Sequence, residues 1–427
     1  MRLPAALGQR GTIAVMAAIS GTTLIGFAGL AVEGGTWYLA LRNTATAADL
    51  AALAGASALE RGQSGVAVAT DTARRNGFAN SDRNTVTVNI PPTTGAFAGN
   101  AAAVEVLVAQ TQTMQLAQMF RATAPVARSR AVAVTNVSQN VCLLALDGGL
   151  ELGGNSTTNA ARCALGSNAA SPGGISVTGS AGVRTDALVT TGTCNGCASG
   201  DVYTDNTRTA RPAVLANQAS PIRDPFANLR SWNASPPPCR ATAISFPGNQ
   251  ATISPGESIC TNLAIGTQDT LTLNPGIYYF RNADMTLHGK LNGNGVTLVF
   301  TGDADRVGTI KTNAQATGSL RGPAESLIPG HPEGAGLVLY RDAKATNNGS
   351  AKEVQLNGGA TMVVFGGMYF PTSDVVVNGN SDQGYSSCHA VVGYRLSFSG
   401  NSDTQVDVSG CANFTAYPTI RITRLVE

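Results

Sequence analysis

The sequence predicts a membrane-anchored α+β unit at the N-terminus, followed by an all-β domain that forms a right-handed parallel β-helix. Three features favour this fold class: an uncharged apolar stretch near the N-terminus, a Gly/Asn turn motif with a fixed period, and cysteines spaced by nearly the same period. A β-sandwich is the alternative for the all-β domain. The predicted boundaries are residues 1–10 for a cytoplasmic N-terminus, 11–32 for a transmembrane helix, 33–137 for the α+β unit and 138–427 for the β domain.

Residues 11–32 carry no charged side chain. At about 1.5 Å per residue, a helix of this length spans roughly 33 Å, enough to cross a hydrocarbon core of about 30 Å. Arg2 and Arg10 precede the stretch and Glu33 follows it, so the positive-inside tendency places the N-terminus in the cytoplasm and the rest outside. A cleaved signal peptide is the alternative, but its apolar core is shorter, about 7–15 residues. We therefore expect a single-pass inner-membrane protein whose bulk is periplasmic.

The α+β unit is predicted from one Ala-rich segment and three alternating segments. Residues 36–59 are rich in Ala and Leu without proline, which predicts a helix that continues the membrane span. The alternating patterns of residues 85–90, 103–110 and 127–135 predict strands, and the apolar spacing of 113–120 predicts a second helix.

The β-helix is predicted from turns that repeat. Gly358, Gly379 and Gly400 begin similar tight turns and lie 21 residues apart, and a fixed period of this size is typical of a solenoid. Gly and Asn tolerate the left-handed conformations that such turns need, while Val, Ile, Leu and Thr stack inside from coil to coil. The motif occurs at 151–156, 176–181, 246–253, 291–298, 356–363, 376–381 and 398–403.

Six of the eight cysteines show almost the same spacing as the coils. Cysteines about one period apart would lie above one another in adjacent coils, and their position after residue 141 places them in an oxidising compartment. The spacing therefore predicts inter-coil disulfides between Cys142 and Cys163, between Cys239 and Cys260, and between Cys388 and Cys411.

The remaining two cysteines form a C-x-x-C motif, Cys194-Asn195-Gly196-Cys197. A structural loop disulfide is the favoured interpretation, because the motif lies amid Gly, Thr and Ser and no second C-x-x-C exists to complete a zinc site. A redox-active pair and half of a metal site remain the alternatives.

Two irregular stretches interrupt the repeat, near residues 198–240 and 302–336. Insertions in a solenoid are usually found on one face, where binding surfaces are often built. Tolerated surface loops are the simpler interpretation of each.

The sequence contains little that indicates chemistry. The net charge is +2 and the basic residues form no run, which argues against nucleic-acid binding. The three histidines, His288, His331 and His389, lie at no metal-ligand spacing with one another or with an acid. We expect no enzyme activity, no catalytic residue, no metal and no cofactor. Asp303, Asp305 and Arg306 form a local cluster. The aspartates could bind calcium, or the cluster could act as the catalytic residues of a polysaccharide lyase, but a solvated turn is the favoured interpretation.

The N-terminal residues resemble TadG-like proteins of the Tad (Flp) pilus-assembly system. The shared features are the small-residue-rich span, Glu33-Gly34 at its outer end, the aromatic pair Trp37-Tyr38, the Ala-rich run at 47–56 and the order of elements up to about residue 130. The resemblance implies a pilin-like α+β unit, with pilin or minor pilins and the Tad secretion machinery as partners.

Two departures from the family pattern limit what the resemblance implies. The position five residues after Gly11 is Met16, where pilins carry Glu, so we expect an anchor that is retained. Some relatives carry a von Willebrand A-type metal motif, but here Asp147 is followed by Gly148 and Gly149 instead of serines, and we expect no such site.

These observations together predict a non-enzymatic, inner-membrane component of Tad (Flp) type IV pilus assembly, with a periplasmic β-solenoid as scaffold or coupling element. The alternative is a surface adhesin or glycan-binding β-solenoid, and a β-helix enzyme acting on polysaccharide is a third hypothesis. Homo-oligomer formation and a final location in the pilus or at the cell surface stay open.

Overall fold

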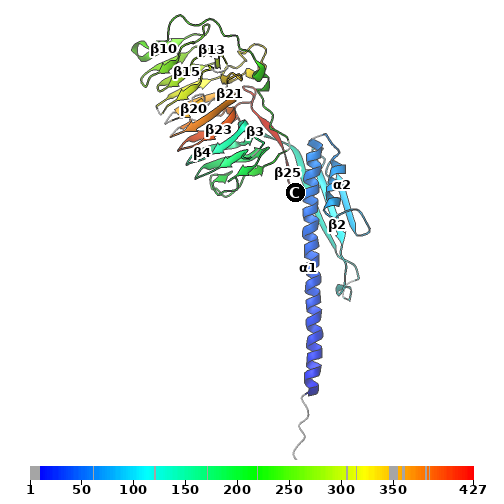
Figure 1. The fold of residues 1–427 in the computed structure, drawn as a ribbon. Helices are drawn as coiled ribbons and strands as arrows, with labels where there is room; N and C mark the ends of the chain where they lie inside the picture. Colours follow the sequence, from blue (N-terminus) through cyan, green and yellow to red (C-terminus); the bar gives the residue numbers. More distant parts are fainter. Residues whose placement is uncertain are drawn as a thin grey trace, which may run out of the picture. The chain divides into compact units, whose positions relative to one another are not determined.

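The computed structural model describes residues 10–60, 62–119, 122–170, 172–218, 220–303, 306–313, 315–345, 354–357, 361–379, 382–383 and 385–427. The chain divides into two compact units (Figure 1). Unit 1 consists of Met1–Ser138 and Arg421–Glu427, and unit 2 of Gln139–Ile420. The sequence assigned 421–427 to the β domain, whereas the structure places this segment in unit 1. Nearly all of the predicted cytoplasmic segment, 1–9, lies outside the described residues.

Two helices form one side of unit 1. Helix α1 (Arg10–Glu60) runs without a break through Gly34 and Gly35, so the predicted span and the Ala-rich helix are one element. Helix α2 (Gly65–Arg75) begins at Ser64, whose Oγ accepts a hydrogen bond from the backbone N–H of Ala67. Helix α2 was not predicted, because its buried positions are only Gly and Ala and give a weak apolar pattern.

An antiparallel sheet packs against these helices. Strands β1 (Asn84–Asn89), β2 (Ala103–Thr111) and the first half of β3 (Val126–Leu152) pair in the order β1–β2–β3, which confirms the three predicted strands. Strand β25 (Thr419–Leu425) leads to Val426 and Glu427, which exchange backbone hydrogen bonds with Val132 of β3. The core of the unit joins small helix residues to valines of the sheet: Ala47, Ala48, Ala51, Ala52, Ala56, Ala69, Ala73, Val104, Val106 and Val108.

The helix predicted at 113–120 is wrong. Only a short 3-10 helix, η1 (Ala117–Met119), forms there. The backbone N–H groups of residues 115–117 donate to the side chain of Glu33. In an α-helix from Thr113 only the last of these, that of Ala117, would have an acceptor within the helix, the carbonyl of Thr113, and here it binds Glu33 instead.

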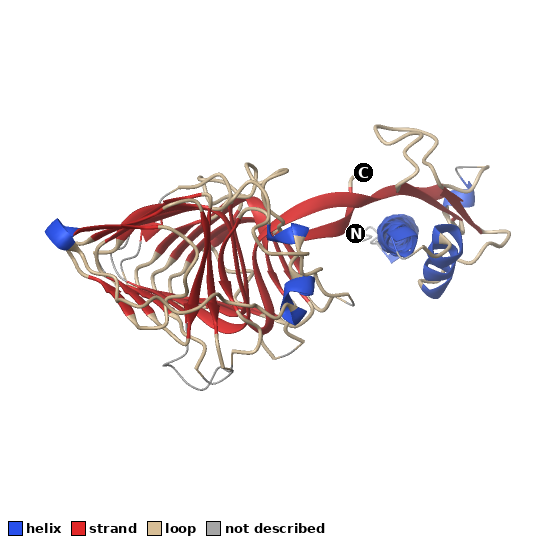
Figure 2. Cartoon of the chain, turned by 90° about the horizontal axis from the view of Figure 1, so that it is seen from above, coloured by secondary structure: helices blue, strands red, loops and turns tan. Residues whose placement is uncertain are grey.

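Unit 2 is a parallel β-solenoid, which confirms the predicted fold and excludes the sandwich. Its coils contribute strands to three parallel ladders (Figure 2). Ladder A contains, in spatial order, β10 (Gln250–Ile253), β12 (Thr270–Leu273), β15 (Lys290–Asn294), β18 (Thr317–Arg321), the start of β21 (Thr361–Asn378), β22 (Asp382–Gln383), β24 (Asp403–Gln405), β4 (Thr157–Ser167), β6 (Gly182–Thr190) and β8 (Val202–Tyr203).

The other two ladders follow the same order of coils. Ladder B contains β13 (Gly276–Arg281), β16 (Val296–Thr301), β19 (Leu337–Arg341), β21, β23 (His389–Phe398), β3, β4, β6 and β9 (Ala213–Leu215). Ladder C contains β11 (Leu263–Ile265), β14 (Met285–Leu287), β17 (Ile310–Thr312), β20 (Val354–Asn357), β21, β23, β3, β5 (Ile175–Val177) and β7 (Cys194–Asn195).

The coils do not stack in the order of the sequence. The chain enters the solenoid in its interior, at β3, and residues 139–215 build a first block outward to one end. Residues 250–411 then build a second block from the opposite end back toward β3. The blocks meet at a seam, where β23 pairs with β3 and β24 pairs with β4. The turn ladders and the core therefore continue across the seam, from the last coil of the second block into the first coil of the first block.

Residues 216–249 connect the far ends of the two blocks, and we call this segment the strap. It includes η2 (Ala227–Ser231) and η3 (Pro247–Asn249), while η4 (Pro332–Gly334) belongs to the second irregular stretch. The backbone carbonyl of Leu229 accepts a hydrogen bond of 2.9 Å from the hydroxyl of Tyr340, and the ring of Phe226 packs 5.2 Å from that of Tyr369. The predicted insertion near 198–240 thus includes most of the strap, which carries the chain back along ladder B.

Candidate functional site

The N-terminal half of α1 exposes an apolar surface that no other part of unit 1 covers among the described residues. Among the described residues, one helix is long and apolar enough to cross a membrane, and it lies near the N-terminus, at Val15–Leu59. Large apolar side chains are exposed along its N-terminal half: Val15, Met16, Ile19, Leu24, Ile25, Phe27 and Val32. Such a continuous exposed surface would be unfavourable in water and fits a single-pass membrane anchor.

Glu33 marks the point where this apolar surface ends. Its side chain is buried, and its carboxylate accepts hydrogen bonds from the backbone N–H groups of Gln115, Leu116 and Ala117 at 2.6, 3.1 and 2.9 Å. The hydrogen bond from Gln115 is the largest of the effects that lower the pKa of Glu33, and those from Ala117 and Leu116 add to it against the opposing effect of burial. Glu33 therefore fixes the 113–117 loop to the helix as an ionised carboxylate.

Two further contacts hold this loop on α1. The indole N–H of Trp37 donates to the carbonyl of Thr113 at 3.3 Å. Leu116 lies over Gly29, where an added Cβ would be 2.0 Å from its Cδ1. Gly29 thus leaves room for the loop to approach the helix at the outer end of the apolar surface. No pattern in the sequence indicates this contact.

A second buried carboxylate, Glu105, lies in the sheet of unit 1. It accepts hydrogen bonds from Asn89 Nδ2 at 2.7 Å, from the backbone and hydroxyl of Thr93 at 3.2 and 3.0 Å, and from Arg130 Nε at 2.7 Å. Burial opposes ionisation of Glu105, but these hydrogen bonds outweigh it and hold its pKa at about 2. Arg130 also pairs with Glu427. A Glu inside the apolar run AVEV was the signal that could have identified this network.

Residues 11–58 match the family described as Putative Flp pilus-assembly TadE/G-like. The match confirms the TadG-like resemblance, and we call residues 11–58 the Tad segment. It coincides with nearly all of α1 and includes Gly29, Glu33 and Trp37. No curated protein and no solved structure matches the chain.

Beyond the Tad segment, the eight cysteines form four disulfides. They join Cys142 to Cys163, Cys194 to Cys197, Cys239 to Cys260 and Cys388 to Cys411. Strand pairing places the first of these pairs in adjacent coils, since Leu143 is the register partner of Leu165. These are the pairs that the coil spacing predicts, and the C-x-x-C motif forms a disulfide within one turn.

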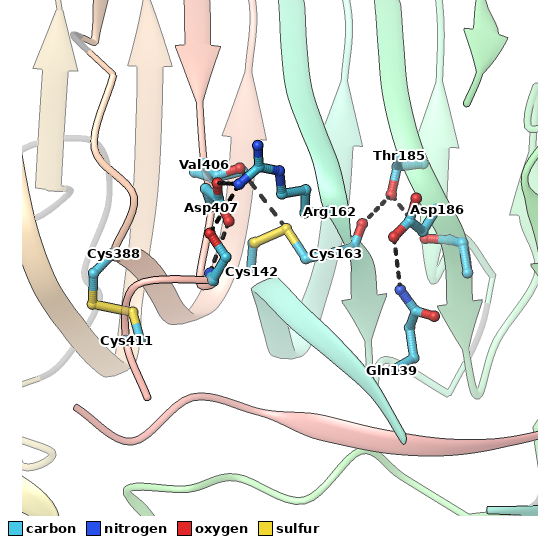
Figure 3. The surroundings of a disulfide bond; sticks show 12 residues. Gln139, Cys142, Arg162, Cys163, Thr185, Asp186, Cys388, Val406, Asp407 and Cys411 are labelled. Atoms are coloured by element: carbon cyan, nitrogen blue, oxygen red, sulfur yellow. Dashed lines mark hydrogen bonds and ion pairs between the residues drawn. A yellow bond between two sulfur atoms is a disulfide. The ribbon is translucent and has the colours of Figure 1, made fainter. Parts of the chain in front are cut away.

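Two of the disulfides lie on either side of the seam (Figure 3). Cys142–Cys163 belongs to the first block and Cys388–Cys411 to the second. Between them, Arg162 Nη1 lies 3.6 Å from Asp407 Oδ2, and Cys163 Sγ lies 3.8 Å from the carbonyl of Val406. Each disulfide therefore fixes the coil that forms one side of the seam.

A ladder of glycine turns crosses the same seam. Gly379, Gly400, Gly154 and Gly179 all have positive φ, between 67° and 87°. A Cβ at Gly154 would lie 2.9 Å from the backbone N of Gly400, and one at Gly179 would lie 2.9 Å from the carbonyl of Gly154. Both the left-handed conformation and the close stacking require glycine. The predicted turn at Gly358 lies outside the described residues.

The residues considered for chemistry are dispersed. His288 contacts the amide of Asn313 at 3.0 Å, His331 contacts Glu333 at 2.9 Å, and His389 is buried, with its pKa lowered to about 4 by burial. Asp303 and Arg306 form an exposed ion pair, and Asp305 lies outside the described residues. Asp147 is exposed. In the part of the chain that the structure describes, no group of three or more His, Cys, Asp or Glu could hold a metal.

Proposed function

We propose that this protein is a non-enzymatic component of Tad (Flp) pilus assembly, anchored in the inner membrane by α1, with the solenoid in the periplasm as a scaffold or coupling element. One observation carries the proposal: the segment that matches the TadE/G-like family is the same helix that exposes a continuous apolar surface. The partners are pilin or minor pilins and the Tad secretion machinery.

The residues at the outer end of the apolar surface support the anchor. Trp37 and Tyr38 follow Glu33, and the guanidinium of Arg42 lies 5.6 Å from the centre of the Tyr38 ring. Trp and Tyr are enriched at membrane–water interfaces, where an apolar ring and a polar group are both solvated. Arg2 and Arg10 precede the span, and the positive-inside tendency supports a cytoplasmic N-terminus.

The disulfides support a periplasmic location for unit 2. Four disulfides in one domain persist only in an oxidising compartment, and all eight cysteines lie after the span. Protease added to intact spheroplasts should therefore degrade the solenoid. Protection of the solenoid until the inner membrane is permeabilised would reverse the proposed orientation.

The solenoid's contribution can be tested without damaging unit 1. Val132 pairs with Glu427 in unit 1, and Val141 donates to the carbonyl of Pro418 in unit 2, so the chain enters and leaves each unit at neighbouring points. A variant that joins Ser138 to Arg421 through a short Asn-Gly turn removes the solenoid and keeps the 421–427 segment of unit 1. Truncation after residue 137 would lose that segment.

Electron microscopy of a deletion strain gives the decisive count of surface pili. We expect pili to be lost on deletion, restored by the full chain and not restored by the variant that lacks the solenoid. Restoration by that variant would make the solenoid accessory to assembly. Pili that persist in the deletion strain would contradict the assembly function and favour the adhesin alternative.

A further inference from the structure

A polar groove opens on the outside of the solenoid at the seam. It has a volume of about 200 Å³, and its polar lining residues are Asn159, Arg162, Arg184, Tyr385, Gln405 and Asp407. The lining residues come from both blocks. The groove therefore forms only because the last coil of the second block stacks on the first coil of the first block.

One wall of the groove is a row of long polar side chains from ladder A. Gln405 is the register partner of Asn159, and Asn159 is the register partner of Arg184. Successive strands in such a ladder lie about 4.8 Å apart, so the three side chains form a regular row across three coils. The Oδ1 atom of Asn159 is buried and has no hydrogen-bond partner among the described residues. A buried acceptor without a donor costs stability, and the amide of Asn159 is therefore held in the row at the expense of one hydrogen bond.

The groove also contains an aromatic ring and a charged pair. Tyr385 is 59% exposed, and its hydroxyl lies 3.4 Å from Asp407 Oδ2. The carboxylate of Asp407 is almost buried and also accepts from the backbone N–H of Ser409 at 2.8 Å. Arg162 lies 3.6 Å from Asp407, yet 65% of its side chain is exposed, so much of the guanidinium is open to a ligand.

We propose that this groove binds a saccharide that bears a carboxylate. A sugar hydroxyl is both donor and acceptor, so it can form hydrogen bonds with the side-chain amides of the lining residues Asn159 and Gln405. The exposed ring of Tyr385 offers an apolar face to the C–H face of a sugar. Arg162 and Arg184 outnumber the single carboxylate of Asp407 among the lining residues, and an arginine fork matches a carboxylate in bidentate geometry. This assignment is independent of the function in pilus assembly.

The test uses the full chain in detergent micelles and isothermal titration calorimetry with a galacturonate tetramer. The fully methyl-esterified tetramer, which keeps the sugar rings and removes the charges, is the matched ligand. We expect Tyr385→Ala and Arg162→Gln each to weaken binding of the charged tetramer by at least about tenfold. Tyr385→Phe keeps the stacking face and should bind within a few-fold of the unchanged protein.

Matched control variants lie elsewhere on the solenoid. Arg306→Gln removes an arginine that is also 65% exposed and paired with an aspartate, and Tyr394→Ala removes another exposed tyrosine. Neither should change the affinity. No binding of the charged tetramer, or binding that Tyr385→Ala and Arg162→Gln leave unchanged, would overturn the proposal. Equal binding of the esterified tetramer would overturn the assignment of the carboxylate.

Discussion

Arg395 and Glu151 form an ion pair across the seam although they are 244 residues apart in the sequence. Both side chains are partly exposed, so the pair itself stabilises the fold by no more than about 1 kcal/mol. The ion pair shows which two strands are neighbours at the seam. Beside it, Leu396 pairs in register with Leu150, and both leucines are buried in the core. The seam is thus a complete coil-to-coil interface between the first and the last parts of one solenoid.

The solenoid should stay together when the chain is cut near the end of the first block. A protease site inserted between Thr207 and Arg208, in an exposed turn, would cleave the chain outside the seam. Each disulfide joins two cysteines of the same fragment. The fragments are therefore connected by the seam, by the pairing of β9 with β6, and by the backbone hydrogen bonds of Val426 and Glu427 with Val132. We expect the fragments to co-elute in gel filtration under non-reducing conditions. Separation of the fragments without denaturant would contradict the continuous seam.

The disulfide at the end of the second block should stabilise the seam. Cys388–Cys411 closes a loop of 23 residues, for which the loss of chain entropy in the unfolded state predicts about 3 kcal/mol of stabilisation. The double variant Cys388→Ser, Cys411→Ser should lower the free energy of unfolding by about this amount in urea titrations. Hydrogen exchange should rise first in residues 403–411. The matched control, Cys239→Ser with Cys260→Ser, should raise exchange at the opposite end of the second block instead.

Arg211 should keep the end of the first block from pairing with other chains. Its Nη1 donates to the carbonyls of Ser199, Gly200 and Val202 at 2.9, 2.9 and 2.7 Å, next to the terminal strand β8. An uncovered strand edge is a template for association, so Arg211→Ala should produce concentration-dependent oligomers in analytical ultracentrifugation. Arg83→Ala, at an exposed arginine of unit 1, is the control. If the Arg211→Ala variant sediments like the unchanged protein, Arg211 does not protect this edge and the prediction is wrong.

Glu105 should make unit 1 sensitive to acid. Its pKa is about 2 in the folded chain against an ordinary value of 4.5, so the ionised carboxylate stabilises the folded state. This contribution is complete above about pH 4.5 and is lost as the pH falls toward about 2. Hydrogen exchange in β2 should therefore accelerate over this range.

The variant Glu105→Gln isolates this effect. It removes a buried charge that pairs with Arg130, and we expect it to destabilise unit 1 by about 3 kcal/mol at neutral pH. The pH dependence of exchange in β2 should become flatter at the same time. Glu151→Gln, at a partly exposed carboxylate of the solenoid, should leave exchange in β2 unchanged. An equally steep pH dependence in Glu105→Gln would assign the acid sensitivity to other carboxylates.

Local patterns allowed many elements to be predicted. The charge-free run near the N-terminus and the Ala-rich run specify a helix, and the alternating runs specify β1, β2 and the start of β3. The segment 113–120, predicted as a helix, is instead held against α1 by a distant carboxylate, Glu33, which binds the backbone N–H groups of residues 115–117. A contact between residues so far apart leaves no periodic trace in either segment. The groove at the seam was missed for the same reason.

The sequence by itself determined the apolar helix, the resemblance of that helix to the Tad family, the parallel coils and the spacing of the disulfides. Each of these depends on neighbours within one coil or one helix, and such periods are visible along the chain. Only the tertiary structure decided the order of the coils, because every coil presents similar edges and a turn ladder such as Gly400 on Gly154 is compatible with many sequence separations. The strap's contacts with Tyr340 and Tyr369 return the chain along the solenoid, so the second block ends against the first. The groove between Tyr385 and Arg162 exists only as a result of that stacking.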